Sequence, residues 1–168
     1  MKRQDRLTIL IQHYNVIDYF NYNYAIEWAM NLLEKGNNHE AVLMLASFAE
    51  PIDSFEIRPY IQNALKATGL DEKNNLDDAI KSYAAIFIFE ISNKVNIKNN
   101  LSRLKNLYND YNFDYDLQPF YLLHYEWMDI EFEEIYGHYY PDVTLDTIEA
   151  AAIKEAKLWL QNNPNPEQ

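Results

Sequence analysis

Apolar residues in this chain recur at helical spacing in one segment after another, with short turns between the segments. Residues 22–35 are the clearest case, because an apolar stripe runs along one side and Gly36 follows where a C-terminal cap belongs. The stripe consists of Ile26, Ala29, Met30 and Leu33. Such stripes must be buried against neighbouring elements, and the chain holds only three glycines, which disfavours a β sandwich. The pattern therefore predicts helices packed on helices.

The same reading applies along most of the chain. The predicted helices cover residues 5–19, 22–35, 40–50, 53–68, 77–94, 98–108, 116–136 and 145–162. In the first of them, the alternation of Leu7, Ile9 and Ile11 leaves a strand possible. Short turns favour antiparallel neighbours, so we expect an all-α fold of stacked antiparallel helical hairpins with about six to eight helices. The hairpins are compatible with degenerate HEAT-like pairs or with an irregular bundle. At 168 residues the chain suits a single helical domain, predicted over residues 1–162 with a frayed tail at 163–168.

Some segments carry more specific expectations. Residues 40–50 are apolar almost all round, which predicts a buried helix. Asp53, with Glu56 three residues later, forms an approximate capping box for the next helix. Pro59 lies late for a first turn, so we expect a kink or a delayed helix start there. A later helix has Pro119 in its first turn, where proline is well tolerated.

Composition excludes several classes of chemistry. There are no cysteines, so disulfides, thiol catalysis and cysteine zinc sites are excluded. No apolar run is long enough to span a bilayer. The apolar run near the N-terminus, Leu7 to Ile11, is short for a secretory signal and no cleavage site follows it. These features predict a cytoplasmic protein.

Negative charge is concentrated in about one third of the chain. The formal net charge is −12, which argues against nucleic acid or an anionic membrane as a direct partner, because both are polyanions. From Asn106 to Ile153 the sequence has no Lys or Arg. The acids of this window are Asp110, Asp114, Asp116, Glu126, Asp129, Glu131, Glu133, Glu134, Asp142, Asp146 and Glu149. A general solubility requirement would spread the charge more evenly, so the window is a candidate site.

The densest part of the window, residues 124–142, lacks the spacing of a di-iron site. Such sites need Glu-x-x-His, whereas His124 precedes Glu126 by two residues and His138 follows Glu134 by four. Upstream, a calcium-loop pattern is incomplete, because a tyrosine stands where the loop requires glycine and another where it requires a bidentate glutamate. No Gly-x-Ser-x-Gly elbow or glycine-rich phosphate loop is present. We therefore expect no metal, no cofactor and no catalytic residues.

Aromatic residues share the window with the acids. Its tyrosines are Tyr108, Tyr111, Tyr115, Tyr121, Tyr125, Tyr136, Tyr139 and Tyr140, and Trp127 lies there too. Rings near fixed charge are typical of binding surfaces, where the rings supply affinity and the carboxylates steer association. On a helix, Glu126, Asp129 and Glu133 fall within about 60° of one another. A merely solvated acidic face is the alternative interpretation.

The sequence also resembles a known class of proteins. The stretch AIEWAMNLLEKGNNHEAVLMLASFAEP resembles the first hairpin of small helical immunity proteins encoded beside bacterial polymorphic toxins. The residues that carry this resemblance are Trp28–Ala29, Leu32–Leu33, Gly36 and Leu43-x-Leu45–Ala46. FYLLHYEWMDIEF and GHYYPDVTLDTI are similar to the aromatic and acidic later part of such proteins. The resemblance implies a non-enzymatic, tight binder of a cognate toxin, often a nuclease with a basic groove, and it implies no catalytic residues.

We therefore expect an acidic binding protein, an immunity protein that neutralises a basic protein partner. The residues predicted to bind this partner are Glu126, Asp129, Glu131, Glu133, Glu134, Tyr139 and Tyr140. Two alternatives stay open. One is a carboxylate-rich metal-binding or hydrolytic enzyme that uses the same acids, and the other is a HEAT-like scaffold with several weak partners.

Overall fold

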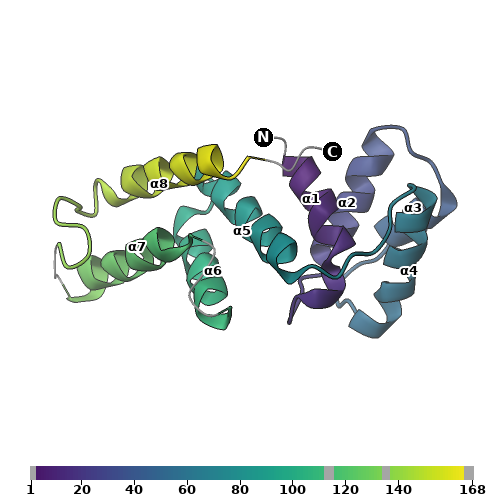
Figure 1. Ribbon diagram of the computed structural model, residues 1–168, viewed down its shortest axis with the longest axis horizontal. Helices are drawn as coiled ribbons and strands as arrows, with labels where there is room; N and C mark the ends of the chain where they lie inside the picture. Colours follow the sequence, from purple (N-terminus) through teal and green to yellow (C-terminus); the bar gives the residue numbers. More distant parts are fainter. Residues whose placement is uncertain (1–2, 112–115, 134–136, 165–168) are drawn as a thin grey trace. The chain divides into compact units, whose positions relative to one another are not determined.

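The computed structural model describes residues 3–111, 116–133 and 137–164, without the side chains of residues 3–5 and 133. Over these residues the chain is helical and contains no strand, which confirms the predicted all-α fold (Figure 1). The chain divides into two compact units, residues 2–82 and residues 83–168. The single domain expected over residues 1–162 stays a prediction, and residues 165–168 of the expected tail lie outside the described residues.

The N-terminal unit is a series of helices, and each of the first four α-helices packs on the next. Its elements are α1 (Arg3–Gln12), the 3-10 turn η1 (Tyr14–Val16), α2 (Asn23–Glu34), α3 (Glu40–Ala46), α4 (Ser54–Ala67) and the beginning of α5 (Leu76–Ser92). Helix α1 packs on α2, α2 on α3, and α3 on α4. Leu10, Leu45 and Ile61 are fully buried in this core. The Trp28 indole N–H donates to the Thr8 hydroxyl at 3.2 Å, which ties α2 to α1.

Helix α3 is buried on one side only, so the expectation of a fully buried helix is wrong. Val42 and Leu45 are buried, whereas Leu43 and Met44 are 48% and 45% exposed. Neighbours α2 and α4 cover one face of this seven-residue helix, and apolar residues on its other face remain at the surface of the unit. A helix that is apolar on every face is therefore fully buried only when neighbouring elements cover each of those faces.

Helix α4 begins at Ser54 because Asp53 caps it. The Asp53 carboxylate accepts from the backbone N–H of Phe55 at 2.7 Å and of Glu56 at 3.1 Å, which confirms the predicted cap. Pro59 lies inside the helix. The expected delayed start is wrong, because the cap satisfies the first free N–H groups before Pro59 is reached. The alternative expectation of a kink stays a prediction.

The C-terminal unit contains the later part of α5, then α6 (Ile97–Asp110), α7 (Gln118–Met128), the π-helical turn η2 (Asp129–Glu133) and α8 (Ile148–Asn162). Helix α7 packs between α6 and α8 and continues directly into η2 (Figure 1). Pro119 lies in the first turn of α7, as predicted. The α-helix expected over residues 116–136 is shorter than predicted, because the backbone changes to π geometry after Met128.

Buried Asn100 holds the turn between α5 and α6. Its side-chain amide donates to the Glu90 carboxylate at 2.9 Å and to the Val95 carbonyl at 3.1 Å. The turn contains two residues with positive φ, Lys94 and Asn96, and Asn96 precedes the first residue of α6. Because the amide satisfies groups at the end of α5 and in the turn, it fixes where α6 starts, and α6 forms one side of the region described next.

Replacement of Asp53 by alanine should lower the free energy of unfolding by about 1 kcal/mol, because two N–H groups at the start of α4 lose their acceptor. Asp53→Asn is the matched control, since asparagine caps helices about as well as aspartate. Urea unfolding followed by circular dichroism measures both. Equal destabilisation by the two variants would show that charge, and not capping, is the contribution of Asp53.

Candidate functional site

Glu126 in α7 is a buried carboxylate that organises the segment after η2. The side chain is fully buried, and Oε1 accepts from the backbone N–H of Gly137 at 2.7 Å. Oε2 accepts from the N–H groups of Tyr139 at 2.6 Å and Tyr140 at 3.1 Å. A buried carboxylate requires such donors, because without them the cost of removing it from water would not be offset. One side chain therefore fixes the backbone of residues 137–140 against α7.

The backbone conformation of residues 137–140 requires a glycine at position 137. Its φ is +71°, and a Cβ built there would lie 3.1 Å from both the Cα and the carbonyl oxygen of Pro141. Gly69 also has positive φ, at +73°, but a Cβ there would meet nothing within 4 Å. A side chain at residue 137 would therefore be strained by the backbone conformation and also obstructed by rigid backbone atoms.

The anchored segment presents His138 and Tyr139 at the surface. Their rings stack with centroids 4.2 Å apart, and His138 Nδ1 lies 2.9 Å from an Asp129 carboxylate oxygen. Tyr139 is 38% exposed. Lost hydration, followed by the negative charge of Asp129, raises the pKa of the Tyr139 phenol. The phenol is therefore neutral at physiological pH and is available as a hydrogen-bond donor beside a carboxylate.

Tyr140 points into the fold instead. It is half-buried, and its hydroxyl donates to the Pro119 carbonyl at 3.3 Å in the first turn of α7. Burial, with a smaller effect of Glu155, raises the pKa of Tyr140 to about 12. The hydroxyl stays protonated at physiological pH and keeps this contact, so Tyr140 ties the segment to α7 and is not an exposed anchor.

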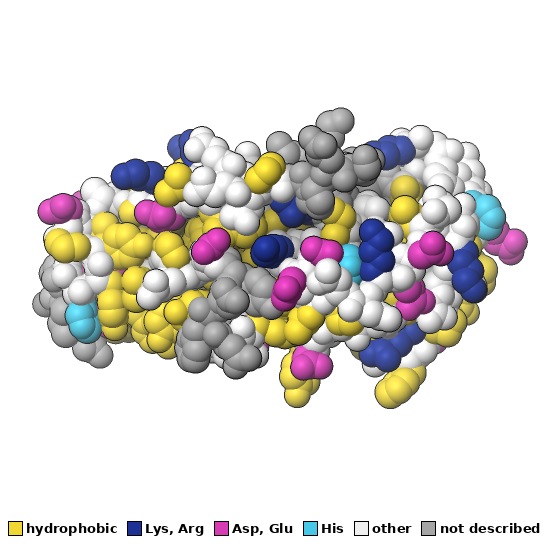
Figure 2. Space-filling view, viewed as in Figure 1, with side chains coloured by type: hydrophobic (Ala, Val, Ile, Leu, Met, Phe, Trp, Pro, Cys, Tyr) yellow, Lys and Arg dark blue, Asp and Glu magenta, His cyan; other side chains and the backbone are white. Residues whose placement is uncertain are grey.

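A row of tyrosines continues from α6 across the outer side of α7. The ring centroids of Tyr108 and Tyr121 lie 4.8 Å apart, and those of Tyr121 and Tyr125 lie 4.9 Å apart. All three side chains are half-buried, so each has an exposed edge. Figure 2 shows hydrophobic side chains, tyrosines included, gathered over α7. We call Tyr121, Tyr125, Asp129, His138 and Tyr139 the acidic–aromatic surface.

On the other side of α7 and η2, the Lys98 ammonium of α6 meets a carboxylate and two rings. Lys98 Nζ forms an ion pair with Glu131. The same nitrogen lies 5.9 Å from the Trp127 ring centroid and 5.6 Å from the Phe132 ring centroid. Beside these residues is a groove of about 620 Å³, lined by Lys98, Asn99, Ser102, His124, Met128 and Phe132.

Basic side chains of α6 lie near the window that has no Lys or Arg of its own. Lys98 pairs with Glu131. Burial, followed by the positive charges of Lys105 and Lys98, lowers the pKa of His124 in α7. Glu131 therefore has a basic neighbour in space, although its stretch of sequence contains none. The packing of α6 on α7 brings distant lysines beside it, whereas Asp129 has only a histidine as its ion-pair partner among the described pairs.

The residues predicted to bind a partner have different positions in the structure. Asp129, Glu131 and Tyr139 reach the surface, and Tyr140 is half-buried. Glu126 must be corrected, because it lies inside the fold and its carboxylate is occupied by backbone donors. The side chain of Glu133 and all of Glu134 lie outside the described residues.

Sequence reasoning missed three residues that the structure adds to this region. They are Lys98, Phe132 and His138. Phe132 lies in the π turn after α7 and is 67% exposed. A π turn rotates each residue less than an α turn does, so the assignment of faces changes after Met128. No local signal places Lys98, because its contacts come from the packing of α6 on α7.

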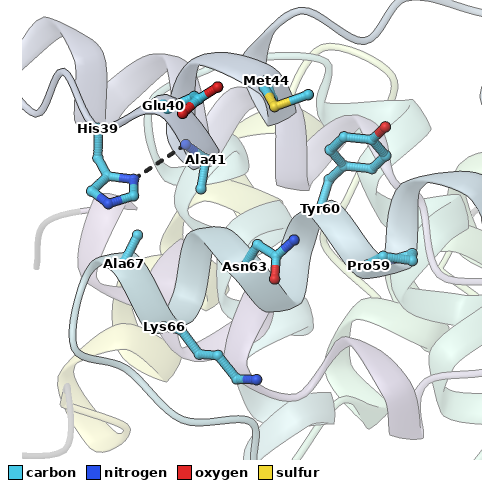
Figure 3. A pocket seen from close by; sticks show the side chains of 9 residues that line it. All are labelled: His39, Glu40, Ala41, Met44, Pro59, Tyr60, Asn63, Lys66 and Ala67. Atoms are coloured by element: carbon cyan, nitrogen blue, oxygen red, sulfur yellow. Dashed lines mark hydrogen bonds between the residues drawn. The ribbon is translucent and has the colours of Figure 1, made fainter.

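A second groove lies in the N-terminal unit, between α3 and α4. It has a volume of about 830 Å³ and its lining includes His39, Glu40, Met44, Tyr60 and Asn63. Figure 3 shows Met44 and Tyr60 at one end, His39 at the other, and Lys66 extending away from α3. His39 is occupied as the cap of α3, since its Nδ1 accepts from the Ala41 N–H at 3.2 Å. The groove is mainly apolar, and Glu40 and Lys66 are the charged residues of its lining.

Within the described ranges, no group of three or more histidine, aspartate or glutamate side chains is arranged to hold a metal ion. Among the helices described, none is both long and apolar enough to cross a membrane. Part of the incomplete calcium-loop pattern, residues 112–115, lies outside the described residues.

Comparison with known proteins found no matching family model, no matching curated protein and no matching solved structure. The resemblance to immunity proteins therefore stays an expectation that depends on the quoted sequence stretches. Inference about function depends on the acidic–aromatic surface and the residues around Lys98.

Replacement of Glu126 by glutamine should lower the free energy of unfolding by about 3 kcal/mol, because one acceptor oxygen becomes an amide group that faces backbone N–H donors. Asp142→Asn is the matched control, since Asp142 is exposed and lies near the same segment. Urea unfolding measures both. An equal effect of the two variants would contradict the anchoring role of Glu126.

Gly137→Ala and Gly69→Ala separate strain from obstruction. Both replace a glycine at positive φ, so each should cost about 1 kcal/mol of unfolding free energy for the backbone conformation. Gly137→Ala should cost at least about 1 kcal/mol more, because its Cβ meets the Pro141 backbone. Thermal unfolding of the two variants is the measurement. Equal losses of unfolding free energy would show that the backbone around Pro141 shifts to accommodate the added Cβ.

Proposed function

We propose that this chain is a non-enzymatic binding protein that captures a basic protein partner through the acidic–aromatic surface, in the manner of an immunity protein that neutralises a toxin. One observation carries the proposal. The buried carboxylate of Glu126 fixes the segment that presents His138 and Tyr139 at the surface, where His138 lies beside Asp129. A fixed arrangement of charge and rings binds with little loss of conformational freedom, which favours recognition.

The composition of the surface supports a basic partner. Tyrosine side chains bury large area at low entropic cost, and Tyr121 and Tyr125 are already ordered by their contact with each other. The carboxylate of Asp129 lies beside the phenol of Tyr139, so a cationic side chain meets both an ion-pair partner and a hydrogen-bond donor or acceptor. The net charge of −12 also speeds encounter with a positively charged molecule.

The proposal includes a cytoplasmic location, where an immunity protein would meet its toxin inside the producing cell. It also includes the HEAT-like interpretation of the hairpins, in which successive helix pairs form a scaffold for the binding surface. Both are supported by the sequence patterns described above.

The test is capture of the partner followed by charge reversal. The tagged protein, incubated with lysate of its source cells, should retain one dominant basic protein that leaves when salt is raised. Asp129→Lys should weaken its association at least about tenfold, because like charges then face each other across the contact. Surface binding kinetics at two salt concentrations measure the change.

Glu40→Lys is the control, because it makes the same change of charge in the N-terminal unit. Equal weakening by Asp129→Lys and Glu40→Lys would mean that net charge alone attracts the partner, and the acidic–aromatic surface would lose its assignment. If the captured protein has a toxic activity, addition of the wild-type chain should abolish it at a one-to-one ratio.

A further inference from the structure

Lys98 occupies an arrangement that has the composition of an organic-cation site. Its ammonium lies between the carboxylate of Glu131 and the rings of Trp127 and Phe132. Both ring distances, 5.9 Å and 5.6 Å, are within the range at which a ring face attracts a cation. A carboxylate beside two rings neutralises the charge of an alkylammonium group, and the rings also cover the methylene groups next to the ammonium.

We infer that Glu131, Trp127 and Phe132 form a receptor for an alkylammonium group, and that Lys98 is a tethered occupant which a lysine side chain of the partner replaces. The inference rests on the proposed function for the identity of the partner, but the receptor itself is a property of this chain. We call these three residues the ammonium receptor.

The ammonium receptor and Lys98 are exposed enough for another cation to replace Lys98. The side chains of Lys98 and Glu131 are 44% and 35% exposed, and Phe132 is 67% exposed, so an incoming group reaches the receptor without unfolding. The ion pair between them lies at the surface, where such pairs contribute little stability. Lys98 therefore leaves the receptor at small cost when another cation is available.

The adjoining groove accommodates the rest of an incoming side chain. Its volume of about 620 Å³ exceeds what a lysine side chain needs, and Met128 and Phe132 supply apolar lining. Asn99 and Ser102 of α6 provide polar groups at the same groove. Burial and the neighbouring lysines keep the pKa of His124 below its usual value, which disfavours a positive charge on this side chain.

The arrangement also sets a threshold for binding. An external cation binds only to the fraction of molecules whose receptor Lys98 has left. Its apparent affinity is therefore its intrinsic affinity multiplied by that fraction. A single free amine therefore competes poorly. A partner that also contacts the acidic–aromatic surface competes well, because its lysine is then held near the receptor at high effective concentration.

The experiment uses the full chain with Lys98→Ala, which empties the receptor. The probe is Nα-acetyl-lysine methylamide, and the neutral comparison is Nα-acetyl-norleucine methylamide. Trp127 reports binding by its fluorescence, because Trp28 and Trp159 are only 2% and 5% exposed whereas Trp127 is half-buried. The lysine probe should bind Lys98→Ala about three- to tenfold more tightly than wild type, as expected if the receptor is open 10–30% of the time.

Lys105→Ala is the matched control, because it removes the same charge from α6 and leaves Lys98 in place. This variant should bind the probe as wild type does. Lys98→Ala combined with Glu131→Gln, or with Phe132→Ala, should lose the added affinity. Circular dichroism verifies that each variant is folded, and Lys98→Gln replaces Lys98→Ala if the alanine variant is not.

Two results overturn the inference. One is equal affinity of the lysine probe for Lys98→Ala, Lys105→Ala and wild type. The other is equal affinity of Lys98→Ala for the lysine and norleucine probes, which would mean that the groove binds alkyl chains without regard to charge. Neither result affects capture of a basic partner through Asp129, so failure of the receptor is distinguishable from failure of the proposed function.

Discussion

The C-terminal unit depends on one buried carboxylate. Glu126 accepts three backbone hydrogen bonds from residues 137–140, and no other described side chain connects α7 to this segment through so many donors. The contact removes a charge from water, so it persists only because the N–H groups satisfy it. The contact also determines where the surface residues lie. It holds His138 and Tyr139 beside Asp129, and it permits Tyr140 to reach the Pro119 carbonyl.

Two kinds of cation contact lie on opposite sides of α7 and η2. On one side Asp129 has a histidine as its neighbour, and on the other Glu131 has a lysine that also lies over two rings. A lysine therefore compensates Glu131, whereas no lysine or arginine among the described ion pairs reaches Asp129. The first side is therefore suited to steer a basic partner, and the second already holds an ammonium group that a partner must replace.

The candidate site was predictable as a region but not residue by residue. The concentration of acids and tyrosines between Asn106 and Ile153 marks the region, because composition survives any arrangement of helices. Helical periodicity assigned Glu126 to the same face as Asp129, and the structure separates them. The reason is that a glutamate in the sequence does not show whether its carboxylate is exposed or accepts backbone N–H groups inside the fold. The donors to Glu126 lie after a π turn, and helical periodicity does not reveal such a turn.

The sequence by itself determined that this chain is helical, roughly where its helices lie, and that Asp53 begins α4, because apolar spacing and caps act within a few residues of the chain. Only the tertiary structure decided which apolar face of α3 is covered, that Glu126 is interior, and that Lys98 neutralises Glu131 within a window without bases. These outcomes depend on which helices pack together. Contacts between residues distant in the chain leave no periodic pattern in the sequence, so local rules do not specify them.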